Sequence, residues 1–128
     1  MSDIPDYLKY SESHVWCELT DEGLLRVGIT DFAQGELGDV VYVELPEEER
    51  VYTAGDECAV VESVKSASDI YCPVTGEIIE VNRELENEPE KINSDPYQDG
   101  WMFMLKPENE ADLDELLDAD GYSDLVDN

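Results

Sequence analysis

The chain of 128 residues carries 34 acidic residues against seven basic ones, which gives a formal charge of −27 at pH 7. Ordinary small domains have a net charge of magnitude about 2–8, and without a basic patch the chain is not expected to bind nucleic-acid phosphates. Three explanations of the charge stay open: a halophilic surface whose repulsion is screened by dense salt, a nucleic-acid mimic that binds basic proteins, and a merely acidic protein. Because the acids are spread along the chain, we favour the halophilic surface.

The length is that of one domain, residues 1–128, with a core over about 12–106 and an acidic helical segment over 108–127. No apolar stretch approaches the length that spans a membrane, and the start of the chain lacks the basic region and apolar run of a secretory segment. We therefore expect a cytoplasmic protein. Cys17, Cys58 and Cys72 form no CxxC pair, which suits buried thiols in a reducing compartment.

Short apolar runs separated by Gly, Pro and Asp predict a mainly β fold in the first half of the chain. After an irregular lead-in over residues 1–11, the predicted strands are 14–19, 24–29, 40–45 and 50–52. One helical turn over 31–34 is expected between the second and third strands, capped by Thr30 and stopped at Gly35.

The second half continues with a hairpin of strands 57–63 and 67–72, a strand at 77–81, a short helix near 83–86 and a central strand at 101–105. A helix is then expected from a cap at Asn109 to Asp120-Gly121, with leucines on one face, followed by a second short turn. This order predicts two small antiparallel sheets packed as a sandwich or flattened barrel, with short helices that include a C-terminal one.

Lys65 lies at the tip of the predicted hairpin, between Val64 and Ser66. A lysine on an exposed turn is poorly suited to Schiff-base chemistry, which needs a desolvated amine with a lowered pKa. The same position suits a lysine that another enzyme grips and modifies, because the turn projects from the sheet.

Around this lysine the sequence resembles a known family. From about Tyr7 to its C-terminus the chain is similar to the H proteins of the glycine cleavage system, and the order and spacing of the matching segments make the resemblance specific. These segments are Glu62–Ser66, which resembles the lipoyl-attachment motif, together with 27–34, 37–46, 54–56, 68–70, 73–78, 93–97 and 100–102. The resemblance implies the lipoyl-domain fold with added N-terminal and C-terminal elements.

The resemblance implies that Lys65 carries lipoate through an amide bond, with Glu62, Val64, Ser66 and Asp69 as the other cofactor-site residues. It also implies a monomeric carrier that is not itself an enzyme. Its partners would be a pyridoxal-phosphate glycine decarboxylase, a tetrahydrofolate-dependent aminomethyltransferase, dihydrolipoyl dehydrogenase, and a lipoate ligase or octanoyl transferase. The cofactor would supply the reactive sulfurs, and the carrier protein would hold them in position for the partner enzymes.

Three rival functions are kept beside this one. Biotin carriers share the fold and place a lysine on the same turn, but they typically have Met on both sides, where this chain has Val64 and Ser66. A lipoyl donor that serves other lipoyl-dependent complexes would carry the same modified lysine. The third alternative is an acidic interaction module in which Lys65 is incidental and carries no modification.

His14 is the single histidine, which excludes a site built from several histidines and makes zinc binding unexpected. H proteins usually have an acidic residue after this histidine, associated with a cleft into which the loaded arm folds, whereas this chain has Val15. Glu12 and Asp69 are the nearby candidates to replace it. We therefore expect protection of the loaded arm to be weaker or rearranged.

Overall fold

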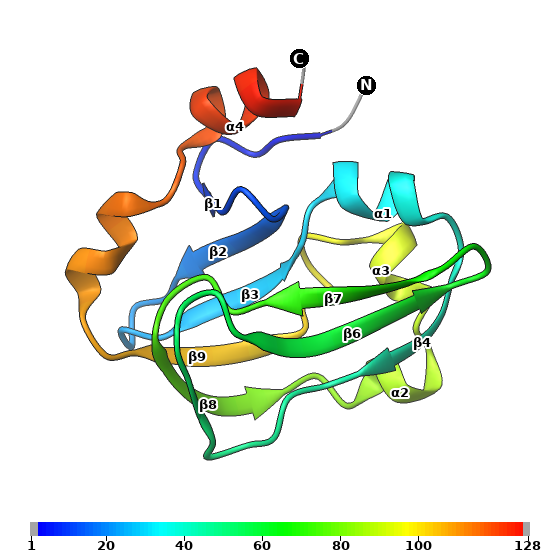
Figure 1. The fold of residues 1–128 in the computed structure, drawn as a ribbon, viewed down its shortest axis with the longest axis horizontal. Helices are drawn as coiled ribbons and strands as arrows, with labels where there is room; N and C mark the ends of the chain where they lie inside the picture. The colour runs from blue at the N-terminus through cyan, green and yellow to red at the C-terminus, as the bar shows by residue number, and fades with distance from the viewer. Residues whose placement is uncertain (1–2, 127–128) are drawn as a thin grey trace.

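The structure is a computed structural model, and it describes residues 3–126. Two antiparallel sheets make up its framework (Figure 1). The first has the order β1 (Lys9–Tyr10), β2 (Val15–Leu19), β3 (Leu25–Ile29), β9 (Phe103–Pro107), β8 (Gly76–Val81) and β5 (Val51–Tyr52). The second has the order β4 (Val40–Glu44), β6 (Glu57–Ser63) and β7 (Ala67–Tyr71).

The two sheets enclose the main hydrophobic core. Alternate residues of a strand point to opposite faces of its sheet, so Val27 and Ile29 of β3 meet Val61 of β6 and Ile70 of β7 in the same buried cluster. The expected fold class is therefore confirmed: a mainly β protein of two packed antiparallel sheets. The strand expected at 101–105 begins two residues later, but β9 is central, between β3 and β8.

Helix α1 (Asp31–Leu37) begins where the sequence predicts and ends later. The Thr30 side chain accepts the amide of Ala33 at 3.2 Å, as expected of an N-cap. The predicted stop at Gly35 is wrong, because the left-handed backbone conformation that ends the helix belongs to Gly38, with φ of 81°. The helix is therefore one turn longer than expected and brings Glu36 and Leu37 toward the β6–β7 hairpin.

The C-terminal segment also differs from the prediction. A 3₁₀ helix, η1 (Glu110–Glu115), follows the expected cap at Asn109, but the chain then pairs with Tyr10 through Leu117 and starts a new helix, α4 (Ala119–Val126). The predicted end of the helix at Asp120-Gly121 is therefore wrong: Gly121 lies inside α4, and Asp118 accepts its amide at 2.8 Å.

Two short helices lie between β8 and β9. Helix α2 (Glu84–Asn87) is one residue later than predicted, while α3 (Lys91–Ser94) was not expected. Each helix buries one apolar side chain, Leu85 and Ile92 respectively, in the main core. One apolar residue in four gives no helical period, which explains why the sequence pattern missed α3.

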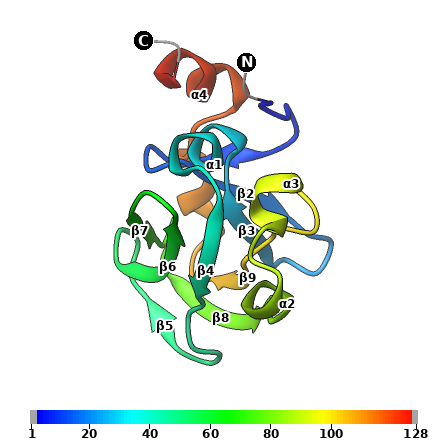
Figure 2. The ribbon, with the colours of Figure 1, turned by 90° about the vertical axis from the view of Figure 1, so that its right-hand side faces the viewer.

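A second, aromatic cluster fixes the N- and C-terminal segments at one end of the molecule, where both ends of the chain lie (Figures 1 and 2). The indole nitrogen of Trp16 donates to the carbonyl oxygen of Pro96 at 3.0 Å, and its ring packs against Gly28 of β3. A Cβ at Gly28 would lie 2.8–2.9 Å from three indole atoms. The cluster contains Leu8, Tyr10, Trp16, Tyr97 and Tyr122.

We expect Gly28→Ala to lower the free energy of unfolding by about 1–3 kcal/mol, because the fully buried indole has no room to move away from the added methyl group. Gly35→Ala is the matched control: a Cβ there meets nothing within 4 Å, so the change should be neutral or stabilising by up to about 1 kcal/mol. Urea unfolding of both variants measures the difference. Equal stability of the two would contradict the packing described here.

Candidate functional site

The β6–β7 hairpin presents Lys65 at its tip. Glu62 pairs with Ala67 as the last rung of the ladder, and the amide of Ser63 donates to the carbonyl oxygen of Ser66 at 2.8 Å. This bond closes a turn in which Val64, Lys65 and Ser66 are all exposed. The lysine therefore has a fixed backbone and an accessible amine.

Ser63 is the residue that fixes this turn through its side chain. Its hydroxyl oxygen accepts hydrogen bonds from the amides of Lys65 at 3.1 Å and Ser66 at 3.2 Å. The hydroxyl itself donates a hydrogen bond to the carbonyl oxygen of Ser66. Serine often caps its own turn in this way. Sequence reasoning did not single out Ser63, although a serine just before a three-residue turn was the available signal.

The tip of the hairpin is also tied to the segment between α1 and β4. The amide of Val64 donates to the carbonyl oxygen of Asp39 at 3.0 Å, and the aliphatic stem of Lys65 lies over Gly38. A Cβ on Gly38 would lie 3.2 Å from Cε and 3.8 Å from Nζ of Lys65. Gly38 thus ends α1 and at the same time leaves room for the lysine stem.

The other site residues predicted from sequence lie in different surroundings. Val64 is 68% exposed, and Glu62 is partly buried on the hairpin ladder. Ser66 contributes to the turn through its backbone groups. Asp69 lies further along β7, where it lines a pocket between β7 and α1.

We name this cavity the α1–β7 pocket; it has a volume of about 300 Å³. Leu37, which precedes Gly38, is part of its wall, so the stem of Lys65 runs beside the pocket. Apolar side chains form much of the lining, with two carboxylates and one imidazole among them. The lining residues are Ser13, His14, Ile29, Phe32, Ala33, Glu36, Leu37, Ser68, Asp69 and Ile70.

The charge of the α1–β7 pocket favours a cation. Glu36 and Asp69 contribute carboxylates, and the lining contains neither lysine nor arginine. Burial lowers the pKa of His14, and the nearby Glu36 opposes this effect in part. An apolar pocket with acidic side chains suits a ligand that combines a hydrocarbon chain with a positive end.

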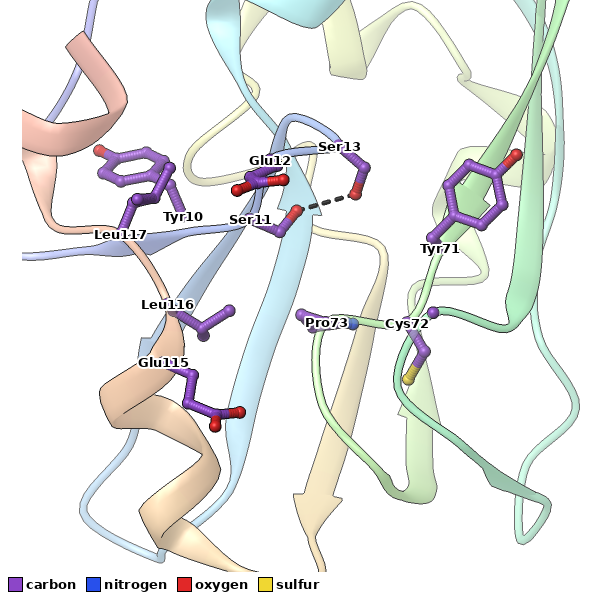
Figure 3. A pocket seen from close by; sticks show the side chains of 11 residues that line it. Tyr10, Ser11, Glu12, Ser13, Tyr71, Cys72, Pro73, Glu115, Leu116 and Leu117 are labelled. Atoms are coloured by element: carbon purple, nitrogen blue, oxygen red, sulfur yellow. Dashed lines mark hydrogen bonds between the residues drawn. The ribbon is translucent and has the colours of Figure 1, made fainter. Parts of the chain in front are cut away.

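A separate cavity of about 350 Å³ lies between the paired N-terminal and C-terminal segments on one side and residues 71–73 on the other (Figure 3). Glu12 lines this cavity, together with Ser11 and Ser13, whose hydroxyl oxygens are 2.9 Å apart. Glu12 is therefore not brought to the α1–β7 pocket, whereas Asp69 is. Val15 lines neither cavity: it is fully buried in the main core.

The three thiols are buried. A hydrogen bond with Cys58 lowers the pKa of Cys72, whereas the other two thiols are poorly suited to act as nucleophiles. Burial raises the pKa of Cys17, and a hydrogen bond to Cys72 together with burial raises that of Cys58. In residues 3–126, no three histidine, cysteine or acidic side chains are grouped so that they could hold a metal ion. The same part of the chain contains no helix long and apolar enough to cross a membrane.

The two packed sheets, with a lysine on an anchored hairpin, define the lipoyl-domain class of carrier folds. Comparison with known proteins makes the assignment specific. The family model of the glycine cleavage H-protein matches residues 8–128, which is nearly the whole chain, so the protein belongs to the glycine cleavage H-protein family.

Individual relatives agree with this assignment. The chain is 55% identical over 126 residues to the glycine cleavage system H protein of Alkalilimnicola ehrlichii, covering 98% of this chain and 97% of the relative. It is 57% identical over 122 residues to that of Pectobacterium atrosepticum, covering 95% and 94%. The crystal structure of a glycine cleavage system H protein from Mycobacterium marinum matches with a TM-score of 0.88 and 37% identity, over 98% of this chain and all of the other.

Removing the Ser63 hydroxyl should loosen the turn. We expect Ser63→Ala to lower the free energy of unfolding by about 0.5–1.5 kcal/mol and to speed amide hydrogen exchange at Lys65 and Ser66, because both amides lose their acceptor. Ser66→Ala is the matched control and should leave both quantities near their wild-type values. If the two variants exchange alike, Ser63 does not hold the turn.

Proposed function

We propose that this protein is the lipoyl carrier of a glycine cleavage system and that Lys65 is the attachment site. The observation that carries the proposal is the exposed lysine on a turn fixed by Ser63 and anchored through Val64, in a chain of the H-protein family. The protein acts as a carrier and has no catalytic role of its own. We further propose a single domain over residues 1–128 that acts as a monomer in the cytoplasm.

The surroundings of Lys65 fit an acyl arm. Lys65 forms no ion pair within residues 3–126, so conversion of its amine to an amide breaks no salt bridge. Its stem already lies over Gly38, beside the α1–β7 pocket. Ile29, Phe32 and Ile70 give this pocket an apolar surface suited to a hydrocarbon chain.

When attached, the lipoyl group supplies the disulfide that accepts the aminomethyl group of glycine. The hairpin holds the root of the arm at an exposed tip, where partner enzymes have access, and tethering raises the local concentration of the group at each of them. The proposed partners are the pyridoxal-phosphate glycine decarboxylase, the aminomethyltransferase and dihydrolipoyl dehydrogenase. A lipoate ligase or octanoyl transferase would modify Lys65.

We propose that the α1–β7 pocket shelters the arm between visits and that its acids are rearranged in this chain. Val15 occupies the position of the usual family acid and is buried away from the pocket. Asp69 and Glu36 supply carboxylates instead, from β7 and α1. The apolar walls keep water from the arm, while the two acids attract the ammonium end of its cargo.

In-vitro lipoylation tests the attachment site. With a lipoate ligase, the wild type should gain one lipoyl group, whereas Lys65→Arg should gain none and keep its fold. Lys106→Arg is the matched control, since Lys106 is also an exposed lysine on the β-framework, and it should be modified as fully as the wild type.

Intact-mass measurement followed by peptide mapping reads the result. Modification of Lys65→Arg, or loss of modification in Lys106→Arg, would contradict the attachment site. Lipoylated wild type should then be loaded from glycine by the decarboxylase. A fully lipoylated protein that the decarboxylase does not load would instead be a lipoyl donor for other complexes.

We also propose that the charge of −27 is an adaptation to concentrated salt. Three basic residues, Arg26, Arg83 and Lys91, form the salt bridges found within residues 3–126. Most acidic side chains in this part of the chain therefore have no cationic partner. Repulsion among the acidic side chains opposes compaction in dilute buffer. Concentrated salt screens this repulsion, because the Debye length falls to about 3 Å at 1 M salt.

Thermal unfolding in KCl tests this adaptation. Between about 0.1 M and 1 M KCl we expect the free energy of unfolding to rise by at least about 1 kcal/mol, which corresponds to a Tm increase of roughly 3–8 °C. Sucrose at equal osmolality controls for effects that do not depend on charge and should raise Tm less. A Tm that is independent of KCl would contradict the adaptation.

A further inference from the structure

The hydroxyl of Tyr122 joins the C-terminal helix α4 to the wall of the α1–β7 pocket. Tyr122 is fully buried, and its oxygen lies 2.8 Å from Nδ1 of His14 and 2.7 Å from Oγ1 of Thr30. Its ring stacks on Tyr10 with centroids 4.7 Å apart and an interplanar angle of 9°. His14 is itself a lining residue of the pocket.

The direction of the protons in this chain of hydrogen bonds follows from the burial of Thr30. Oγ1 of Thr30 already accepts the amide of Ala33 at 3.2 Å, and within residues 3–126 its own proton has only the Tyr122 oxygen as acceptor. Thr30 is fully buried, so its hydroxyl cannot donate to solvent instead. Thr30 therefore donates to Tyr122, and Tyr122 donates to Nδ1 of His14.

The reverse direction would leave a buried donor unpaired. If Nδ1 carried the proton and donated to Tyr122, then Tyr122 would donate to Thr30, and the Thr30 proton would have no acceptor in the described part of the chain. An unpaired buried hydroxyl is unfavourable. A phenol is also a stronger acid than a neutral imidazole and is the better donor of the two.

We propose that Tyr122 is a positioning residue for His14: its hydroxyl donates to Nδ1, so the neutral ring keeps its proton on Nε2 and offers a hydrogen-bond donor in the pocket wall. Nε2 forms no hydrogen bond within residues 3–126 and is therefore available to an occupant. The amide oxygen at the root of an acyl arm on Lys65 is the matching acceptor. This last step rests on the proposed function, whereas the protonation pattern does not.

The backbone supports a fixed position for the ring. His14 has a left-handed φ of 69°, which is unusual for a residue other than glycine. Its amide donates to Ser11 at 3.2 Å, its carbonyl oxygen accepts the amide of Thr30 at 3.1 Å, and its ring contacts Phe32 at 5.0 Å between centroids. Glu36 of α1, Asp69 of β7 and Tyr122 of α4 are the ionisable groups around the pocket side of this ring.

Nitrogen NMR of the single histidine tests the proposal on the unmodified protein. Above its pKa, the His14 ring of the wild type should show a protonated Nε2 and an unprotonated Nδ1. Tyr122→Phe keeps the stacked ring but removes the donor, so Nδ1 should become partly protonated and the pKa of His14 should rise by about 0.5 to 1. Tyr10→Phe is the matched control and should change neither, because the Tyr10 hydroxyl donates to Pro5 instead.

A protonated Nδ1 in the wild type would overturn the proposal, and this result does not depend on whether Tyr122→Phe folds. A folded Tyr122→Phe with the wild-type tautomer and pKa would also overturn it. Lipoylation of the wild type should then shift the Nε2 proton resonance of His14. If the tautomer is as proposed but this resonance does not move, the use of the pocket by the arm fails while the positioning role of Tyr122 stands.

Discussion

The attachment of the β6–β7 hairpin tip to the end of α1 is the constraint on which the functional geometry depends. A free hairpin would move its lysine through a wide volume, but the bond from Val64 to Asp39 fixes the tip beside α1. Gly38 makes this contact possible, because it ends the helix with a positive φ and leaves space for the Lys65 stem. The exposed amine and the α1–β7 pocket are therefore held side by side.

The same helix links the hairpin to the ends of the chain. Thr30 caps α1, hydrogen-bonds to Tyr122 of α4 and donates its backbone amide to the carbonyl oxygen of His14. The two terminal segments thus do more than cover the core: the N-terminal segment contributes Ser13 and His14 to the pocket wall, and the C-terminal segment holds His14 through Tyr122. This explains why a carrier would extend a two-sheet domain at both ends, since the added segments build a site that the sheets alone lack.

Much of the fold could be predicted from sequence, because period-2 alternation and turn residues are local signals. The strands around Val27, Val43 and Val61 were expected within one residue at each boundary, and Lys65 was expected at a turn. Long-range contacts account for the failures. Gly121 was expected to end a helix, yet the chain pairs with Tyr10 at Leu117 and then starts α4, which contains Gly121. Likewise, only the tertiary arrangement of α1 and β7 places Glu36 and Asp69 around one pocket and leaves Glu12 in another cavity.

The central claim is that Lys65 carries an acyl arm in the cell, and peptide mapping of protein purified from its native cells tests it most directly. The account predicts a lipoyl-sized or octanoyl-sized mass increment on the peptide that contains Lys65 and on no other lysine. A biotin-sized increment would contradict the assigned cofactor while keeping the fold. An unmodified Lys65 in cells that make lipoate would contradict the carrier function itself and favour an acidic interaction protein.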